Sequence, residues 1–445
     1  MIKSIFQNNV FEGKNFRKLL KLNKKSILYY KELNLNKIWL SDLIPNYTNE
    51  YKISYFKKIN QLLKLVTKIF FYEYNLIKKN NGKDKIWILL SNSVRKSHLD
   101  FIKSEEKSIE NPSIVSWERK FKIKKVSKII NQIKYSYLSI KYSKKIFKNS
   151  NYLKIAYNTL VSIDLFESKI LNKPSAILSL KDFQRYENAI IQKSNLLKIP
   201  TFVTQHTVHP NYIGKNERGG NLVFFNSEAK NILLWGNFLK QSYKQYHNDK
   251  KFYFSKNFIL PYGKKIIFKK KKGILFFFGS KRHIYENLSM IKLLFKNKTY
   301  FKENFEIFIK LHPAISSTLF NKYFKKYLAE YDYKILLSKN VSNKILVNSN
   351  LFAVTGLSGS YYDCIYLGLK TLFFDYGIEL SNKLPRVTNN LKLNSNLKTK
   401  LFELEKIPNK QWKKKSDNIL KKVWGIGVNE KSRIRLTDEI SKIIS

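Results

Sequence analysis

Residues 175–204, SAILSLKDFQRYENAIIQKSNLLKIPTFVT, carry the clearest fold signal in the chain. The run 175–180 is short and mostly apolar, as in a buried strand, and residues 186–197 repeat apolar side chains at helical spacing. A second short run that suits a strand follows at 199–204. This order of strand, helix and strand predicts a β-α-β unit, and such units build parallel sheets that are covered by helices.

The same alternation continues after this unit. The pattern predicts a strand at 222–225, a helix at 229–243 and a strand at 258–260 that ends at a turn over 261–263. A basic connector, 264–272, leads into a second series, whose strands are predicted at 274–278, 305–311, 333–337, 351–355 and 371–374. Its helices are predicted at 284–295, 318–327 and 360–367.

The first 150 residues are less regular. Short runs that suit strands stand at 26–30, 69–72 and 86–90. We therefore expect two α/β domains in tandem, residues 1–265 and 266–407, and a Lys-rich helical tail, 408–445, that packs back across both. Because ligands of open parallel sheets bind beyond the carboxyl ends of the strands, a site is expected in the loops that follow them.

The charge of the chain is unusual. Its 445 residues include 84 Lys and Arg against 32 Asp and Glu, a net charge of +52, yet only nine of the basic residues are Arg. A hydrophobic content of 43% excludes a disordered basic tail protein. Proteins that recognise phosphates and base edges favour Arg, whose guanidinium forms two hydrogen bonds at once. The excess of Lys therefore indicates either a general bias of composition or a role near an anionic membrane.

The sequence also bears on compartment and cofactors. The single Cys, Cys364, cannot form an intramolecular disulfide, and no Cys/His grouping has zinc spacing. Residues 1–9 lack the apolar core of a signal peptide, and no stretch approaches the roughly 20 apolar residues of a spanning helix. We expect a cytoplasmic protein that could at most lie on the inner face of the cytoplasmic membrane.

The most informative loop follows the predicted strand 351–355. Gly356, Ser358, Gly359 and Ser360 are small, so the backbone can approach a ligand there, and Ser358 or Ser360 can cap the helix that follows. Free N–H groups at such a helix start favour a phosphate. The alternative is an ordinary Ser/Gly turn between a strand and a helix.

Two further loops of the second half carry cations or a titratable group. His312 and Pro313 end the strand 305–311, and a His there can donate to a phosphate oxygen or a ribose hydroxyl. Gly279, Ser280 and Arg282 follow the strand 274–278, in a place suited to a diphosphate. Alternatively, His312 is an ordinary loop residue packed against its neighbours, and the basic pair that includes Arg282 occurs by chance in a Lys-rich chain.

The first half offers groups for acceptor chemistry. Gln205 and His206 follow the strand 199–204, and Asp182 and Arg185 follow the strand 175–180. A carboxylate or imidazole at this edge could take a proton from a sugar hydroxyl. Asp182 could instead cap the next helix.

Together these features resemble GT-B glycosyltransferases of bacterial surface-polysaccharide synthesis. The resemblance covers about residues 174–380 and rests on Gln205-His206, on Lys-Leu-His-Pro at 310–313 and on Gly-Leu-Ser-Gly-Ser at 356–360. It is nearest to capsule and lipopolysaccharide enzymes of the Kdo-transferase kind and, through 373–376, more distantly to glycerophosphotransferases of teichoic-acid synthesis. It implies a GT-B-like α/β fold in which two Rossmann-like domains face a central cleft.

The resemblance also implies roles for the loop residues. The second domain would hold a nucleotide-activated sugar donor through Gly279, Ser280, Arg282, His312, Pro313, Gly356, Ser358, Gly359 and Ser360. The first domain would hold a glycan or glycolipid acceptor through Gln205 and Arg185, with Asp182 or His206 as the catalytic base.

The expected function is therefore transfer of a sugar from a nucleotide-sugar to a surface polysaccharide or lipopolysaccharide. No Asp-x-Asp pair flanks a predicted strand end, so we expect transfer without a metal or any cofactor besides the nucleotide-sugar substrate. A CDP-glycerol-type glycerophosphotransferase and a nucleotide-sugar epimerase are alternatives, because one architecture serves several reactions. A non-specific nucleic-acid-binding protein is a distant alternative, since no zinc-finger or RNA-recognition signature is present.

Overall fold

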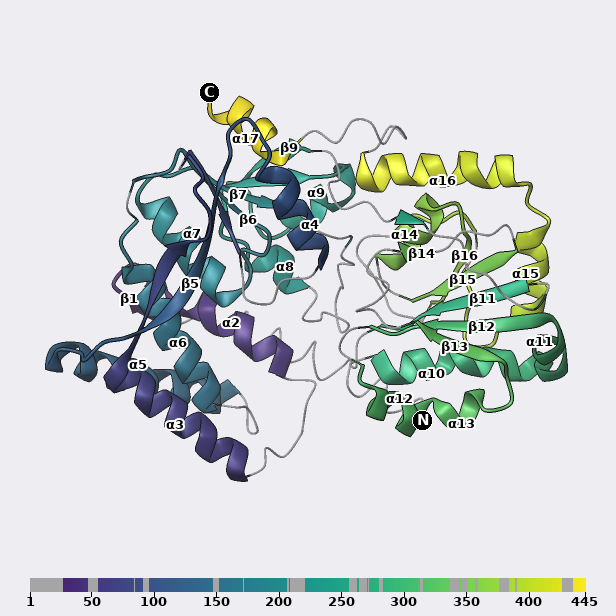
Figure 1. Ribbon diagram of the computed structural model, residues 1–445, viewed down its shortest axis with the longest axis horizontal. Coiled ribbons are helices and arrows are strands. Elements are labelled where there is room, and N and C mark those ends of the chain that lie inside the picture. The colour runs from purple at the N-terminus through teal and green to yellow at the C-terminus, as the bar shows by residue number, and fades with distance from the viewer. Residues whose placement is uncertain are drawn as a thin grey trace.

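The computed structural model contains two α/β domains side by side (Figure 1). It describes the following residues: 27–46, 55–83, 85–90, 96–146, 152–170, 172–205, 208, 221–255, 262–263, 270, 272–279, 283–312, 315–336, 344–345, 350–356, 359–375, 384–388, 390–425 and 435–445. The expected α/β fold class with two Rossmann-like domains is confirmed.

The first domain is built on a seven-stranded sheet. Its strands are, in spatial order, β3 (Tyr72–Lys78), β5 (Ser113–Phe121), β4 (Ile86–Leu89), β6 (Ala176–Ser179), β7 (Thr201–Thr204), β8 (Asn231–Leu234) and β9 (Lys251–Phe254). The pair β3 and β5 is antiparallel, and the remaining neighbours are parallel. The predicted β-α-β unit is thus present, with β6 and β7 adjacent.

Helices cover both faces of this sheet, which is why its central strands are apolar on both sides. The helices and short elements of this domain are β1 (Tyr29–Tyr30), β2 (Leu33–Asn34), α2 (Leu35–Asn46), α3 (Tyr55–Phe71), α4 (Lys96–Glu105), α5 (Val126–Ile146), α6 (Tyr152–Glu167), α7 (Arg185–Leu196), α8 (Leu222–Phe225), η3 (Asn237–Leu239) and α9 (Lys240–Lys244). Alternate strand residues pack on α6 and α7 on one face and on α4 on the other.

The second domain is built on a five-stranded parallel sheet. Its strands are, in spatial order, β13 (Tyr333–Leu336), β12 (Phe305–Lys310), β11 (Lys272–Phe277), β15 (Leu351–Thr355) and β16 (Lys370–Phe373). Its helices are α10 (Ile284–Lys292), η5 (Leu293–Asn297), α11 (Lys298–Asn304), α12 (Ser317–Tyr323), α13 (Lys325–Leu328) and α14 (Ser360–Tyr366). A two-residue parallel pair, β10 (Tyr262–Gly263) and β14 (Lys344–Ile345), lies apart from this sheet.

Three helices end the chain: α15 (Leu397–Glu405), α16 (Asn409–Trp424) and α17 (Leu436–Ile444). The core of the second domain includes α16 residues, and Trp424 at its end packs edge-on against Trp235 of the first domain, with ring centroids 6.4 Å apart. The last helix, α17, returns to the first domain, where Leu436 and Ile440 join the core beside α4 (Figure 1). Residues of α16 and α17 therefore join the cores of different domains, while the domain bounds expected from the sequence stay a prediction.

Some predicted elements differ from the structure. Residues 222–225 form α8 instead of a strand, and the predicted helix 229–243 begins with β8. Most of 69–72 belongs to α3, with β3 starting at Tyr72. The predicted strand 258–260 lies outside the described residues, as does most of the connector, so the boundary at residue 265 stays a prediction.

Candidate functional site

The topology of the second sheet points to one edge. The chain passes from β11 outward through β12 to β13 and then crosses back to β15 on the other side of β11. The order therefore reverses between β11 and β15, and a crevice for a ligand opens beyond the carboxyl ends of strands at such a switch point. Gly279, His312 and Gly356 follow three adjacent strands at this edge.

The turn after β11 is fixed by one buried side chain. Asn287 of α10 accepts a hydrogen bond from the N–H of Gly279 at 2.8 Å and donates to its carbonyl at 3.1 Å. A Cβ atom at position 279 would lie 3.0 Å from Cβ of His283, so a larger residue would crowd this turn. The sequence therefore needs a small residue where the chain leaves β11. Ser280 and Arg282 lie outside the described residues.

The chain leaving β12 is tied to the same turn. The N–H of Phe278 donates to the carbonyl of Lys310 at 3.1 Å, and the carbonyl of His312 accepts from the N–H of Ile315 at 2.9 Å. His312, which is half-buried, thus lies next to the Phe278–Gly279 turn at the sheet edge. The expected placement of His312 at the carboxyl end of its strand is confirmed, and Pro313 lies outside the described residues.

The loop after β15 leads into α14. Thr355 and Gly356 are buried, and the carbonyl of Thr355 accepts from the N–H of Phe374 at 2.7 Å. The N-cap position of α14 is Gly359, and no side chain caps the helix there. Of the two expected caps, Ser360 is the first helical residue and does not cap α14, while Ser358 lies outside the described residues.

A carboxyl group of α14 faces the end of β12. Burial raises the pKa of Asp363 to about 7, and the nearby cation of Lys310 opposes that rise. The Lys310 ammonium also lies 5.5 Å from the ring centroid of Phe277. Asp363 can thus exchange a proton near neutral pH beside the switch point, a property that its sequence position alone did not indicate.

A second polar cluster follows β16, and no sequence pattern predicts it. The Arg386 guanidinium stacks 4.1 Å from the centroid of the Phe373 ring and lies 4.0 Å from the Asp375 carboxylate. Asn390 donates to the same carboxylate at 2.5 Å and accepts a hydrogen bond from Arg386. The only hint in the sequence was that Arg386 is one of nine Arg. Residues 384–388 are also bound to α14, where Tyr361 accepts a hydrogen bond from the N–H of Val387 at 2.9 Å.

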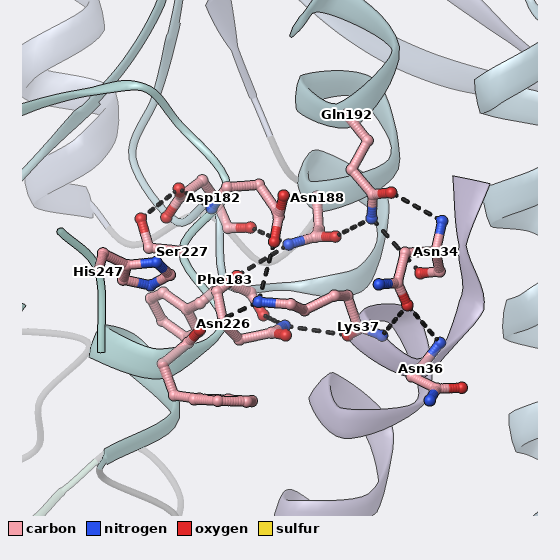
Figure 2. Close-up of polar contacts among 12 residues, drawn as sticks. Asn34, Asn36, Lys37, Asp182, Phe183, Asn188, Gln192, Asn226, Ser227 and His247 are labelled. Atoms are coloured by element: carbon pink, nitrogen blue, oxygen red, sulfur yellow. Dashed lines mark hydrogen bonds and ion pairs between the residues drawn. The ribbon is translucent and has the colours of Figure 1, made fainter. Parts of the chain in front are cut away.

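In the first domain, Asp182 is buried, with 1% of its surface exposed. Its Oδ2 accepts three hydrogen bonds from the turn before β8: from Ser227 Oγ at 2.6 Å, from Glu228 N at 2.8 Å and from Ala229 N at 2.9 Å. Figure 2 shows the Asp182 and Ser227 side chains pointing toward each other. Burial raises the pKa of Asp182, and the nearby Lys250 ammonium opposes that rise.

This arrangement favours a structural role for Asp182 over the role of catalytic base. Lys250 donates to the carbonyls of Ser227 at 2.9 Å and Ala229 at 2.6 Å, so the turn is held from both sides. The N-cap position of α7 is Gln184, without a side-chain cap, so the alternative in which Asp182 caps that helix is wrong. The base role stays a prediction to be tested.

An amide network extends this anchoring to α2. Asn226 donates to the carbonyls of Lys37 and Phe183 at 2.9 Å each, and Asn188 of α7 donates to the carbonyl of Asp182 at 2.9 Å. Figure 2 shows these side chains converging from α2, α7 and the segment before β8. Nearby, burial and the Lys250 ammonium lower the pKa of His247 to about 4, so this imidazole is neutral at physiological pH.

The remaining predicted acceptor residues are placed differently. Gln205 is buried, and its Oε1 accepts from the N–H of Trp235 at 3.0 Å, which links the ends of β7 and β8. Arg185 is the first residue of α7, with its guanidinium 4.9 Å from the ring centroid of Tyr186. His206 lies outside the described residues. The sequence placed these residues at strand ends without revealing their partners, and their role toward an acceptor stays a prediction.

A separate cavity of about 790 Å³ lies between β3 and the ends of α6 and α7. Several of its charges are paired: Lys128 lies 2.9 Å from Glu73 and 3.2 Å from Glu167. Behind them Lys68 and Asp164 form a buried ion pair at 2.6 Å. Because removal of one partner of a buried ion pair is strongly destabilising, we assign a structural role to the paired residues of this network.

Two features bear on metals and membranes. Among the described residues, no group of three or more His, Cys, Asp or Glu could hold a metal ion. Within the same part of the chain, every helix is too short or too polar to cross a bilayer.

No protein-family model matches the chain, and no curated protein sequence matches it. Among solved structures, UDP-GlcNAc 2-epimerase from Methanocaldococcus jannaschii is 12% identical with a TM-score of 0.43, over 80% of this chain and 99% of that one. The S. aureus MnaA–UDP co-structure is 11% identical with a TM-score of 0.46, over 81% and 97%. A GtfA/B complex is 10% identical with a TM-score of 0.38, over 65% and 61%. At these values the residues of the site, and not the matches, must identify the function.

Proposed function

We propose that the chain is a glycosyltransferase that uses a nucleotide-activated sugar and binds the donor's phosphates at the carboxyl edge of the second sheet. The observation that supports this most is the position of Gly279, His312 and Gly356 after three adjacent strands at the switch point. Small residues there let backbone N–H groups approach an anion, and the imidazole of His312 can donate to a phosphate oxygen.

In the proposed reaction a hydroxyl oxygen of the acceptor attacks the anomeric carbon of the donor sugar. The bond between that carbon and the phosphate oxygen breaks, and the nucleotide leaves with the electron pair. His206, which directly follows β7 and Gln205, is the proposed base for the hydroxyl proton. His312 and Arg282 would stabilise the charge that develops on the leaving phosphate, in place of a divalent metal.

The proposed acceptor is a growing surface polysaccharide or lipopolysaccharide at the inner face of the cytoplasmic membrane. This follows the resemblance of Lys-Leu-His-Pro at 310–313 and Gly-Leu-Ser-Gly-Ser at 356–360 to capsule and lipopolysaccharide enzymes of the Kdo-transferase kind. The excess of Lys suits an enzyme that works beside anionic lipid.

Binding and transfer test the proposal together. A nucleotide that binds the native state alone raises the melting temperature, so CMP, CDP, UDP and GDP are compared in a thermal-shift assay. His312→Ala should abolish the shift that the preferred nucleotide causes and lower transfer by about 100-fold or more. Lys400→Ala, which removes a cation from α15 of the same domain, is the control and should leave both unchanged. A full shift and full transfer in the His312 variant would refute the role of that residue.

The same assay separates the alternative reactions. A transferase consumes the donor only when an acceptor is present, whereas an epimerase changes the sugar without one. Transfer of glycerol phosphate from CDP-glycerol would identify the glycerophosphotransferase. Either result would overturn sugar transfer while keeping the donor site at the second sheet.

A further inference from the structure

Helix α3 presents an apolar face to solvent. It contacts the core of the first domain through Leu65 and Ile69 on one side. The large apolar side chains that are exposed on α3 are Tyr55, Phe56, Ile59, Leu62, Leu63, Val66, Phe70 and Phe71. Phe56 is 84% exposed and Leu63 is 59% exposed, so this surface is far from buried. An amphipathic helix of a globular domain normally turns its apolar stripe toward the core, which α3 does only in part.

The exposed side chains form a continuous stripe. Most of them recur three or four positions apart from residue 55 to residue 70, and such positions share one face of a helix. At 1.5 Å per residue the 17 residues of α3 extend over about 25 Å. Figure 1 shows α3 at the lower edge of the first domain.

The stripe continues onto the neighbouring elements. Phe71 stacks on Phe121 at the end of β5, with ring centroids 6.1 Å apart, and Phe121 is itself exposed. On α5, which contacts α3, four exposed apolar residues recur at helical spacing: Val126, Ile130, Ile133 and Tyr137. We call the exposed apolar residues of α3, α5 and Phe121 the α3–α5 face.

The charged side chains of helices α3 and α5 are all basic. The sequence of α3 contains four Lys and that of α5 contains five, and neither helix contains Asp or Glu. Two of these nine, Lys68 and Lys128, are paired with carboxylates of other elements, which leaves at most seven for the surface. Exposed Lys57, Lys58 and Lys64 lie on α3 outside the apolar stripe. A helix with Phe and Leu on one face and Lys on the other is the pattern of segments that lie in the plane of a membrane surface.

We propose that the α3–α5 face docks on a bilayer that contains anionic lipid. Its aromatic and aliphatic side chains would enter the boundary between headgroups and acyl chains, and its lysines would pair with lipid phosphates. Near such a surface each Lys strengthens binding about fivefold. A second copy of the chain is a poorer occupant, because it would bring another wholly basic helix pair and another net charge of +52 to the contact. The proposal rests on this surface and not on the donor site.

Sedimentation with vesicles tests the proposal on the full chain. We compare vesicles of phosphatidylcholine alone with vesicles that also contain phosphatidylglycerol, and expect binding to the anionic ones that weakens as salt rises. Phe56→Asp should weaken this binding by about 10- to 100-fold, the factor that corresponds to losing one buried aromatic side chain. Ile109→Asp is the matched control, because Ile109 is 83% exposed in the same domain and lies outside the α3–α5 face.

Two results would overturn the proposal. In the first, Phe56→Asp and Ile109→Asp bind anionic vesicles as well as the parent chain does. In the second, the parent chain forms a dimer in lipid-free solution that Phe56→Asp dissociates, which would make this face an interface between copies. Nucleotide binding in the thermal-shift assay should be the same in Phe56→Asp and in the parent, so a failure of the donor-site proposal would be recognised separately.

Discussion

Asp182 offers a direct choice between a structural and a catalytic carboxylate. Its Oδ2 takes three hydrogen bonds from the turn over 227–229, and Lys250 holds the carbonyls of the same turn. Asp182→Ala removes the acceptor and leaves three buried donors without a partner. Asp182→Asn keeps a carbonyl oxygen of the same reach and shape but cannot act as a base.

The magnitudes follow from the number of donors. A buried donor that loses its partner costs about 1–3 kcal/mol, so Asp182→Ala should lower the free energy of unfolding by about 3 kcal/mol or more. Asp182→Asn keeps an acceptor for the three donors and should cost about 1 kcal/mol. Asp249→Ala is the control, because that carboxylate forms an exposed ion pair with Lys230 at 3.1 Å and such pairs contribute about 0–1 kcal/mol.

Urea unfolding followed by circular dichroism gives the stabilities, and initial rates of sugar transfer give the activities. A structural Asp182 predicts that the Asn variant keeps most of its activity while the Ala variant is strongly destabilised. The opposite pattern, an Asn variant of parental stability with transfer abolished, would refute the structural role and restore Asp182 as the base.

Three further predictions concern the pH response and the chain terminus. Burial raises the pKa of Asp363 to about 7, so the folded protein holds a proton that the unfolded chain has lost. The free energy of unfolding should therefore fall by at most about 1.4 kcal/mol per pH unit as pH rises toward 7. Asp363→Asn should remove this part of the pH dependence when urea unfolding is measured from about pH 4 to 8. Glu105 accepts hydrogen bonds from the N–H groups of Leu436 and Thr437 at 3.2 and 2.9 Å. Glu105→Ala should therefore weaken the docking of α17 by about 2 kcal/mol, measured as faster amide hydrogen exchange confined to that helix. Unchanged exchange in α17 would contradict this prediction. Gly425 has φ +65°, and a Cβ there would lie 1.9 Å from the carbonyl oxygen of Trp235. Gly425→Ala should therefore lower the free energy of unfolding, measured in urea, by at least about 2 kcal/mol. A variant as stable as the parent would show that the chain at Gly425 can move to make room for the methyl group.

Short apolar runs predicted most central strands of the two parallel sheets, but an apolar run alone did not separate a strand from a helix. The runs at β6, β11, β12 and β15 were found because each is wholly or mostly buried in a parallel sheet. The sequence Leu-Val-Phe-Phe at 222–225 is equally apolar but forms α8, since four such residues fit a buried helix turn as well as a strand. β5 was missed because Trp117-Glu118-Arg119-Lys120 mixes charge into its exposed end.

The candidate site was predictable to the level of loops and no further. Strand ends in a parallel sheet share one edge, so His312 and Gly356 could be grouped from sequence alone. Other contacts could not be predicted in this way. They are the hydrogen bonds to Asp182, the two hydrogen bonds between Asn287 and the backbone of Gly279, and the stacking of Arg386 on Phe373. These contacts depend on three-dimensional packing, which no local pattern encodes.

The return of α17 to the first domain makes the second domain an insertion within the first. The polypeptide enters the second domain after β9 and leaves it after α16, so two chain segments connect the domains. Two domains in tandem would be connected by one segment. Two tethers permit opening and closing about the line through them but resist free rotation of one body on the other. Cutting the chain after Gly425 would therefore leave one covalent connection between the domains. The second domain could then rotate freely relative to the first.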